Sequence, residues 1–473
     1  MPFYENLKDF KKNTALITED GKNISYENLL IASNQFASKI SERCLIFILI
    51  DNDLESITAL IGSEISNSAI MLLSPNINNE ALIKLINSYN PEYIFLNTKL
   101  KIKIENYDEI FSYYNYELLK IKKIILKEIN DELFLLQTTS GSTGSPKNVK
   151  LSYDNVLSNT NSIIKDLNIS NNDVCITTLP PSYVYGLSII NTHLKVGAKI
   201  VLNKSSIIEK NFWKKLTLND VNNFGGVPYI YEILIKIGLK KEFFKSLKYT
   251  TVAGGYLDNS LKLSILDFYD DLNISLITMY GAAEATSRMS YLPAKYARKK
   301  NGSIGIPVSD GTFLLKNESK EIIKKPYFNG EIIFKGKNVC MGYANSSKDL
   351  LKSDVNKSIL TTGDIGYFDE DGFFYIVGKK NRYIKIVGNR ISLDEIEKII
   401  YEYGYKNVCS QKTKDTLDIY VNKKNIEKKI NTYVSKYTNL HKNLFRVHYI
   451  KSFPMTKNNK KDYNNKIFKD ENW

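Results

Sequence analysis

Apolar runs and amphipathic segments alternate along the first part of this 473-residue chain. CLIFILI at 44–50 has the length and composition of a buried strand, and apolar residues recur at helical spacing in 26–40 before it. The alternation continues through 174–203, where VCITTLP and AKIVLN flank a helical segment. Strands that alternate with helices form mostly parallel sheets covered by helices, so the pattern predicts an α/β fold.

The pattern changes from about residue 302, where short strands and turns follow one another. Segments such as GTFLLKN and GEIIFKG predict a compact β subdomain. After Gly378 come a charged turn, the strand RYIKIVG and the helix SLDEIEKIIYEYG. We therefore predict a large N-terminal domain over 1–378, with mostly parallel sheets, flanking helices and the β subdomain. A small α+β C-terminal domain follows over 382–473.

Residues 137–149 read QTTSGSTGSPKNV, a glycine- and hydroxyl-rich loop. Its closely spaced glycines let successive N–H groups turn inward, and its hydroxyls and lysine add donors suited to a polyphosphate. The P-loop pattern G-x-x-x-x-G-K-[ST] is absent, and a flexible linker is the alternative interpretation. The strand-like FLLQTT before the loop, and a helix capped by Ser152 after it, favour the phosphate site. The candidate phosphate contacts are Thr139, Ser140, Gly141, Ser142, Thr143, Gly144 and Lys147.

Composition excludes several other classes. Hydrophobic residues make up 43% of the chain, and its length predicts two or three domains. The sequence has no apolar run of membrane-spanning length and no signal-peptide pattern, so we expect a cytoplasmic protein with no membrane partner. The four cysteines are scattered without a C-x-x-C pair, which argues against zinc sites and disulfides.

The net charge of +14 is spread along a lysine- and asparagine-rich sequence with no basic arm. Genomic base composition accounts for such a bias without a nucleic-acid partner, and we predict none. A basic surface also suits a phosphate-bearing ligand or a separate acidic protein partner.

Three motifs occur in a fixed order: TSGSTGSPKNV at 139–149, MYGAAEA at 279–285, and a long segment from TTGDIGYFDEDG to RISLDEIE at 361–397. Their order resembles the adenylate-forming superfamily, which contains acyl-CoA synthetases, the adenylation domains of peptide synthetases and firefly luciferase. The N-terminal ISYENLLIASNQFASKI and the late FPMTKNNKKDY match its pattern as well. The resemblance covers nearly the whole chain and implies that ATP activates a carboxylic acid.

Adenylation joins a carboxylate to the α-phosphate of ATP, so an anion attacks a polyanion and the site must supply cations and aimed donors. No Ser/His/Asp arrangement is present, and we interpret the three histidines as structural. The resemblance implies two catalytic residues: Glu284, which binds Mg²⁺, and Lys460, which the mobile domain delivers to the reacting groups. A helix-start glutamate and a solvated lysine tail are the alternatives.

The resemblance assigns nucleotide contacts to Tyr280, Gly254, Gly255, Gly281, Asp364 and Lys379. Tyr280 stacks on adenine in this assignment, and the glycines let the backbone approach it. Asp364 accepts hydrogen bonds from the ribose hydroxyls, although a lone Gly-Asp also marks an ordinary turn. Gly388 corresponds to the loop that lines the pantetheine channel, and its retention favours a second, thioester-forming half-reaction.

Several positions depart from the family pattern. Ala283 stands where threonine is usual, Lys379 where arginine is usual, and Asn381 where the hinge aspartate is usual. Each change removes a donor or a charge. These departures leave open a degenerate nucleotide-binding homologue with a non-catalytic role.

We expect the acid pocket in PPSYVYGLS and GGVPYIYE, with Tyr183, Gly186 and Val227 as contacts. No aspartate is found there to hold an α-ammonium group, so we predict a modest uncharged or hydroxylated acid. The sequence thus predicts an AMP-forming acid–thiol ligase that uses ATP and Mg²⁺. The acyl group passes through an acyl-adenylate to CoA or to the phosphopantetheine of a carrier protein.

Overall fold

The computed structural model describes most of the chain and divides it into two compact units. The described residues are 4–100, 102, 104–122, 128–138, 148–238, 240–386, 389–413, 415–455, 461–463 and 465–468. Unit 1 comprises Met1–Thr139, Lys147–Thr312 and Phe334–Leu360, and unit 2 comprises Ser140–Pro146, Phe313–Ile333 and Thr361–Trp473.

Sheet A of unit 1 has nine strands. They are β1 (Thr14–Ile17), β2 (Asn23–Ser25), β10 (Val174–Ile176), β11 (Lys199–Val201), β12 (Asn223–Gly226), β13 (Tyr249–Val252), β14 (Ser275–Tyr280), β15 (Ser290–Leu292) and β16 (Ile306–Pro307). Their spatial order is β16-β15-β14-β13-β12-β10-β11-β1-β2. The strands from β14 to β1 pair in parallel, whereas β2, β15 and β16 add antiparallel edges.

Sheet B of unit 1 has eight strands. They are β3 (Leu45–Leu49), β4 (Ala69–Leu73), β5 (Tyr93–Asn97), β6 (Tyr107–Tyr113), β7 (Tyr116–Ile121), β8 (Leu133–Thr138), β9 (Asn148–Ser152) and β19 (Gly342–Ala344). Their spatial order is β19-β9-β8-β4-β3-β5-β7-β6. The central strands from β8 to β5 are parallel, and the outer ones are antiparallel. The expected parallel pairing therefore holds at the centre of each sheet and gives way at the edges.

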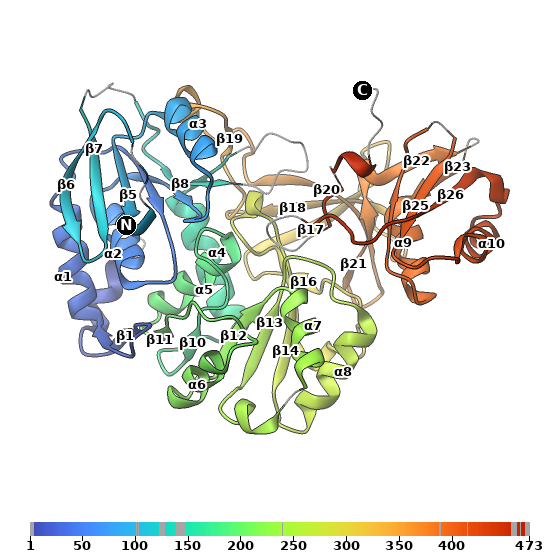
Figure 1. Ribbon diagram of the computed structural model, residues 1–473, viewed down its shortest axis with the longest axis horizontal. Coiled ribbons are helices and arrows are strands. Elements are labelled where there is room, and N and C mark those ends of the chain that lie inside the picture. The colour runs from blue at the N-terminus through green and yellow to red at the C-terminus, as the bar shows by residue number, and fades with distance from the viewer. Residues whose placement is uncertain are drawn as a thin grey trace. The chain divides into compact units, whose positions relative to one another are not determined.

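Helices connect the parallel strands, and short side chains cap several of them. The helices of unit 1 are α1 (Tyr26–Ala37), α2 (Leu54–Ile65), α3 (Asn79–Tyr89), α4 (Tyr153–Leu167), α5 (Val184–Lys195), α6 (Lys210–Leu218), α7 (Pro228–Ile237) and α8 (Asn259–Asp270). Ser25, Asp53 and Ser152 each accept a backbone N–H at a helix start, as N-caps do. Figure 1 shows β12, β13 and β14 side by side, with α7 and α8 beside them.

Apolar side chains cover both faces of the central strands. In β3, Ile46 and Ile48 join the largest core, which also contains residues of sheet A, α2 and α5. The alternate residues Phe47 and Leu49 join a second core with Leu82 of α3. Burial on both faces explains why CLIFILI reads as a continuous apolar run.

Smaller sheets follow in the last third of the chain. They are built from β17 (Gly311–Lys316), β18 (Gly330–Gly336), β20 (Ile359–Phe368), β21 (Phe374–Lys379), β22 (Tyr383–Ile386), β23 (Asn389–Ser392), β24 (Asn407–Ser410), β25 (Leu417–Val421) and β26 (Phe445–Tyr449). Strands β17, β18, β20 and β21 form one sheet, β22 and β23 a hairpin, and β24 to β26 a three-stranded sheet. Two helices, α9 (Leu393–Glu402) and α10 (Glu427–Thr438), pack on a core that contains Ile396, Ile400 and Val434.

Short 3₁₀ helices occupy several connections. They are η1 (Glu5–Phe10), η2 (Thr98–Leu100), η3 (Lys241–Phe244), η4 (Ala283–Ala285), η5 (Ala294–Tyr296), η6 (Ser347–Asp349), η7 (Lys380–Arg382), η8 (Lys442–Leu444) and η9 (Lys466–Phe468). Two of them, η4 and η7, carry residues of the predicted site.

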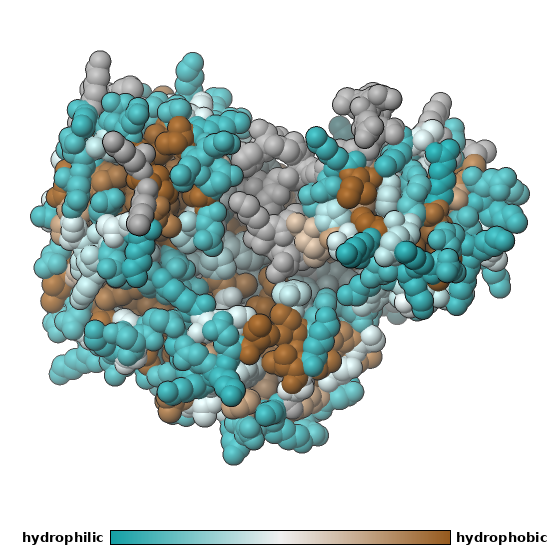
Figure 2. Space-filling model, in the orientation of Figure 1, coloured by the Kyte–Doolittle hydropathy of each residue, from teal (hydrophilic) through white to brown (hydrophobic). Residues whose placement is uncertain are grey.

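The predicted fold class is confirmed: large α/β sheets with flanking helices precede smaller C-terminal sheets. The boundary at 378–382 stays a prediction, and unit 2 includes the residues from Thr361 onward. Within the described ranges, no helix is both long and apolar enough to cross a membrane. The face in Figure 2 is largely hydrophilic, with an apolar patch in the region of α7, where Ile237 is exposed.

Candidate active site

Predicted site residues of unit 1 gather at one edge of sheet A. Val227 follows β12, Gly254 follows β13, and Tyr280 ends β14. These three strands are parallel neighbours in direct register, with Gly226 opposite Val252 and Val252 opposite Thr278. Their carboxyl ends therefore lie together, and this is the edge at which open α/β sheets bind ligands.

Gly254 and Tyr183 meet at this edge. Gly254 has φ +87°, and a Cβ placed on it would lie 2.5 Å from the hydroxyl of Tyr183 and 3.4 Å from Val227 Cγ1. A side chain would therefore be strained by the backbone and blocked by the tyrosine. Gly255, the next residue, leaves room beside Pro228. The structure thus brings together the glycines predicted to approach adenine and two residues predicted to line the acid pocket.

Gly186, the third predicted pocket residue, lies in α5 against backbone. A Cβ there would lie 2.3 Å from the carbonyl oxygen of Pro180. The glycine therefore lets α5 pack on the preceding turn, and its contact with an acid stays a prediction.

The turn after Tyr280 doubles back on itself. A Cβ on Gly281 would lie 1.7 Å from the carbonyl oxygen of Ser287, so only glycine fits. Asn338 holds the turn from outside, because its amide donates to the carbonyl oxygens of Ala285 and Arg288, each at 2.9 Å. The hydroxyl of Thr286 donates in return to the carbonyl oxygen of Asn338 at 2.8 Å. The position of Glu284 inside this turn is therefore fixed by backbone contacts.

Glu284 presents a partly exposed carboxylate. The hydroxyl of Tyr343 donates to Glu284 Oε1 at 3.0 Å, and the N–H of Cys340 donates to the Glu284 carbonyl at 2.9 Å. Burial raises the pKa of Tyr343, and the nearby carboxylate raises it further, so the phenol keeps its proton and remains a donor. In the described part of the chain no group of three His, Cys, Asp or Glu residues could hold a metal. One carboxylate fits Mg²⁺, which binds through one or two carboxylates together with substrate phosphates.

The predicted phosphate contacts Thr139, Ser140, Gly141, Ser142, Thr143, Gly144 and Lys147 lie outside the described residues. The strands on either side are described: β8 and β9 are antiparallel, with Thr138 opposite Asn148. Ser152 caps α4 as predicted, through a capping box with Asn155. The loop does not lead directly into this helix, however, because β9 intervenes and pairs with β19 on its other edge. Val149 lies opposite Tyr343 in that pairing. The strand that follows the loop, β9, therefore pairs with the strand that carries Tyr343, the hydrogen-bond partner of Glu284.

In unit 2, Asp364 and Lys379 form an ion pair. They lie opposite each other on β20 and β21, and Lys379 Nζ lies 2.7 Å from Asp364 Oδ1. The aspartate is buried, whereas the lysine is exposed. Lysine in place of the family's arginine therefore still supplies a positive charge to the predicted ribose-binding carboxylate, although it lacks a fork of donors.

The predicted hinge residue Asn381 lies in η7 between two anchored cations. Lys380 pairs with Glu331 at 2.8 Å, and the Arg382 guanidinium pairs with Asp394 and Glu397 of α9. Its role as a hinge stays a prediction. Gly388 lies outside the described residues.

Lys460 also lies outside the described residues, but its neighbour Lys461 has a clear role. Lys461 Nζ lies 2.7 Å from Glu397 Oε2 and donates to the carbonyl oxygen of Asn407 at 2.8 Å. The hydroxyl of Tyr463 donates to the same carboxylate at 3.0 Å. Lys461 therefore ties its segment to α9. The catalytic role of Lys460 stays a prediction.

Sequence reasoning missed Tyr343 and Arg288. Tyr343 belongs to a strand far from Glu284 in the chain, so no local pattern links the two residues. Arg288 is the only charged residue between Glu284 and Lys295, and it is buried. A lone arginine in an otherwise uncharged run was the available signal.

The histidines and cysteines have structural surroundings. His193 is buried in α5, and burial lowers its pKa; His448 pairs with Asp418 at 2.7 Å. His441 accepts the N–H of Asn443 at the start of η8. All four cysteines are buried, and none of them forms a disulfide.

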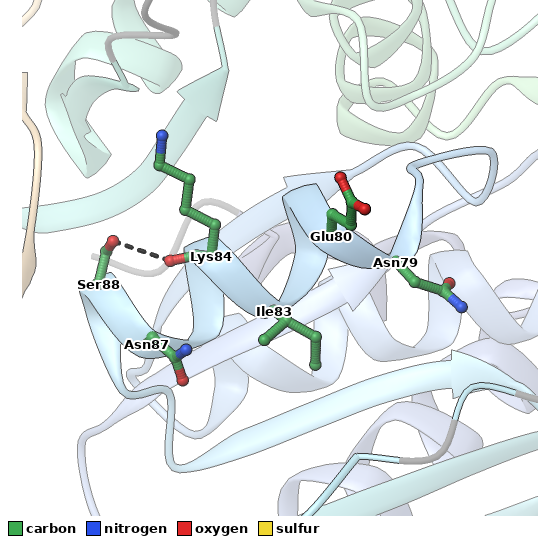
Figure 3. A pocket seen from close by; sticks show the side chains of 6 residues that line it. All are labelled: Asn79, Glu80, Ile83, Lys84, Asn87 and Ser88. Atoms are coloured by element: carbon green, nitrogen blue, oxygen red, sulfur yellow. Dashed lines mark hydrogen bonds between the residues drawn. The ribbon is translucent and has the colours of Figure 1, made fainter.

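A hollow beside α3 is unrelated to the site described above. Figure 3 shows its described lining, which consists of Asn79, Glu80, Ile83, Lys84, Asn87 and Ser88. The hydroxyl of Ser88 donates to the carbonyl oxygen of Lys84 at 2.8 Å, an ordinary bond within a helix. No predicted site residue lies among these six, and we assign the hollow no function.

A family model described as "AMP-binding enzyme" matches residues 3–344. A 2-succinylbenzoate–CoA ligase of Bacillus cereus (strain AH820) is 25% identical over 418 residues, which cover 84% of this chain and 83% of that ligase. A long-chain-fatty-acid–CoA ligase of Bacillus subtilis (strain 168) is 32% identical over 299 residues, which cover 61% of this chain and 50% of that ligase.

Solved structures show the same fold. O-succinylbenzoate coenzyme A synthetase from Bacillus subtilis in complex with AMP has a TM-score of 0.79 at 19% identity, covering 98% of both chains. ATP-bound MatB from Rhodopseudomonas palustris has a TM-score of 0.81 at 18% identity, covering 98% of this chain and 97% of that one. The predicted enzyme class, an ATP-dependent and AMP-forming acid–thiol ligase, is confirmed at the level of the family. The chain belongs to the family of AMP-binding enzymes.

Proposed function

We propose that this protein activates a small carboxylic acid with ATP and then transfers the acyl group to the thiol of CoA. The observation that carries the proposal is the arrangement around Glu284. Tyr343 holds its carboxylate, and the strand of that tyrosine pairs with the strand that follows the phosphate loop. A carboxylate held by the strand that pairs with β9 suits nucleotide chemistry, because β9 follows the predicted phosphate loop.

In the first half-reaction, an oxygen of the acid attacks the α-phosphorus of ATP. The bond between the α-phosphorus and its bridging oxygen breaks, and the electron pair leaves on pyrophosphate. Mg²⁺ bound by Glu284 would supply charge neutralisation on the phosphate oxygens. Lys460 would place an ammonium between the carboxylate and the α-phosphate, where repulsion between anions is greatest. Asp364 would accept hydrogen bonds from the ribose hydroxyls, and Tyr280 would stack on adenine.

In the second half-reaction, the thiolate of the acceptor attacks the acyl carbonyl carbon and AMP leaves with the electron pair. The thiol proton passes to solvent. CoA is the acceptor named for the ligases to which the chain is similar. A carrier protein bearing phosphopantetheine presents the same thiol, and the net charge of +14 would favour an acidic carrier. We place both reactions in the cytoplasm, where ATP and CoA are available.

ATP–pyrophosphate exchange with a panel of carboxylic acids tests the first half-reaction without knowledge of the acceptor. We expect exchange with at least one acid, loss of exchange in Glu284→Gln, and acyl transfer to CoA in the wild type. Adenylation without transfer to CoA would direct the search to a carrier protein. ATP binding without exchange for any acid would instead favour the degenerate, non-catalytic homologue.

A further inference from the structure

Arg288 is a buried cation beside the predicted acid pocket. The residue is 3% exposed, and its guanidinium carbon lies 3.9 Å from the ring centroid of Tyr185. Tyr185 in turn packs edge-on against Tyr183, with their ring centroids 6.4 Å apart. The arginine therefore reaches the same group of side chains that Gly254 and Val227 contact at the carboxyl edge of sheet A.

The donors of Arg288 are only partly used. Nε–H donates to the sulfur of Met279 at 3.1 Å, and Nη1 donates to the hydroxyl of Ser287 at 2.8 Å. Thioether sulfur is a weak acceptor. In the described ranges of the chain, no carboxylate pairs with this guanidinium, and Nη2 donates no hydrogen bond. The N–H groups of Nη2 therefore remain available to an anion.

The neighbouring tyrosines do not supply the missing negative charge. Burial raises the pKa of Tyr185 to about 12, against the opposing effect of Arg288, and burial also raises the pKa of Tyr183. Both phenols are therefore neutral near pH 7. The hydroxyl of Tyr185 is also engaged, because it donates to the carbonyl oxygen of Thr251 at 2.8 Å.

An unpaired buried guanidinium is unfavourable. Burial lowers the pKa of Arg288, even though the tyrosines act in the opposite direction. Stacking on Tyr185 compensates for only part of the lost hydration. Arginine also stays protonated at any physiological pH, so it cannot escape the cost by losing its proton. A residue of this kind is expected where a ligand brings the counter-ion.

We propose that Arg288 binds a second carboxylate of the substrate, so that the acid activated by this enzyme is a dicarboxylic acid. The proposal rests on the proposed function and specifies its substrate class. One carboxylate reacts with the α-phosphate of ATP, and the other pairs with the guanidinium at the pocket wall. The same positive charge repels a substrate ammonium group. The class differs from the uncharged acid expected from the sequence, because that expectation considered only the tyrosine and glycine segments.

Matched acids test the proposal directly. Linear and aromatic dicarboxylic acids are compared with their monoamides, which keep the shape and replace the second carboxylate by a neutral group. In ATP–pyrophosphate exchange we expect the best diacid to exceed its monoamide in kcat/KM by at least about 100-fold. Arg288→Met should raise KM for the diacid far more than it lowers kcat, and Arg288→Lys should recover part of the loss. Equal use of diacid and monoamide by the wild type would overturn the proposal.

Lys262 provides a matched control. It is another buried cation of unit 1, 2% exposed, and in the described residues its Nζ has no hydrogen-bond partner. Lys262→Met therefore also removes a buried positive charge, and we expect it to keep the wild-type preference for the diacid. If Lys262→Met and Arg288→Met reduced the use of both acids in equal proportion, Arg288 would be structural and the proposal would fail.

Calorimetric titration separates this proposal from the proposed function. Each acid is titrated into wild type and Arg288→Gln in the presence of a non-hydrolysable ATP analogue. Binding of a diacid that depends on Arg288 would support the site even if no exchange were found. Binding of no diacid, or equal binding of the monoamide, would overturn it.

Discussion

Two arginines of this protein share a setting and differ in one respect. Arg288 of unit 1 is buried, Arg382 of unit 2 is partly buried, and each lies over a tyrosine ring, with centroid distances of 3.9 Å to Tyr185 and 3.8 Å to Tyr463. Arg382, however, pairs with Asp394 and Glu397 of α9. Burial opposes its charge, but the two carboxylates outweigh that effect and raise its pKa, whereas burial lowers the pKa of Arg288.

The difference separates a structural cation from a functional one. Around Arg382 the protein supplies the counter-ions, so the group is complete when the chain has folded. Around Arg288 the described residues supply only weak or neutral acceptors, so the group is complete only when an anion binds. Stacking on an aromatic ring does not distinguish the two roles, and the presence of a carboxylate does.

The largest effect is expected from Arg382→Met. Removing this cation leaves the buried carboxylate of Glu397 and the partly exposed carboxylate of Asp394 without it. The cost is about 3 kcal/mol, at the lower end for a broken buried ion pair, because Lys461 still pairs with Glu397. Hydrogen exchange in peptides covering α9 should be about 100-fold faster, since each 1.4 kcal/mol is tenfold. Arg288→Met should leave exchange at the carboxyl edge of sheet A nearly unchanged, because no carboxylate is stranded. If both variants lost the same protection from hydrogen exchange, the distinction between a structural and a functional arginine would not hold.

The lysine pair near the chain end gives a second test of the same distinction. Lys460→Ala should reduce ATP–pyrophosphate exchange by about 10²–10³-fold with little effect on folding, because the lysine acts on developing charge. Lys461→Ala should lower the melting temperature by a few degrees, through loss of its contacts with Glu397 and Asn407, and keep most of the exchange activity. Severe loss of exchange in Lys461→Ala, with Lys460→Ala unaffected, would show that the register is wrong.

Glu64 shows how a buried acid differs from a buried arginine. It is 4% exposed, both its oxygens accept the N–H of Tyr4 at 3.1 Å, and burial raises its pKa to about 8. The pKa of Glu64 is higher in the folded protein than its unfolded value of 4.5. The contribution of Glu64 to the free energy of unfolding is therefore complete below pH 4.5 and is lost as pH rises through 8. Wild type should therefore lose stability relative to Glu64→Gln by up to about 1.4 kcal/mol per pH unit in this window. Parallel curves of melting temperature against pH would contradict this assignment.

The smallest effect is expected from Ala283→Thr. Ala283 begins η4 beside Glu284, and a threonine there would restore the hydroxyl that the family usually has. One hydrogen bond to a phosphate is worth about 1 kcal/mol, so exchange should be unchanged or raised by up to about fivefold. The measurement is the KM for ATP and the kcat of exchange. A severe loss would indicate a site shaped around alanine.

Local signals in the sequence identified elements whose physical cause is local. α9 is predicted within 392–404 and found at Leu393–Glu402, because its apolar positions recur at helical spacing. Ser152 caps α4 for the same kind of reason, since the cap and its N–H partner are three residues apart. Glu284 and Asp364 were found through motifs, and their surroundings could only come from the fold.

Other features depend on segments that are distant in the chain. β19 pairs with β9, and Tyr343 thereby reaches Glu284, although no pattern near residue 343 indicates either contact. Arg288 lies outside the motif segments, and its significance appears only when its neighbours prove to be uncharged.

The pairing of β9 with β19 has a consequence for biosynthesis. Residues 148–152 leave the ribosome long before residues 342–344, so the frame of the phosphate loop lacks its outer strand during much of translation. Lys150 adds to this delay, because its ammonium donates to the carbonyl oxygens of Asp349 and Lys352. A nascent chain that ends before this segment should therefore carry the complete loop sequence without a competent nucleotide site. Completion of this frame therefore waits for the synthesis of residues 342–352.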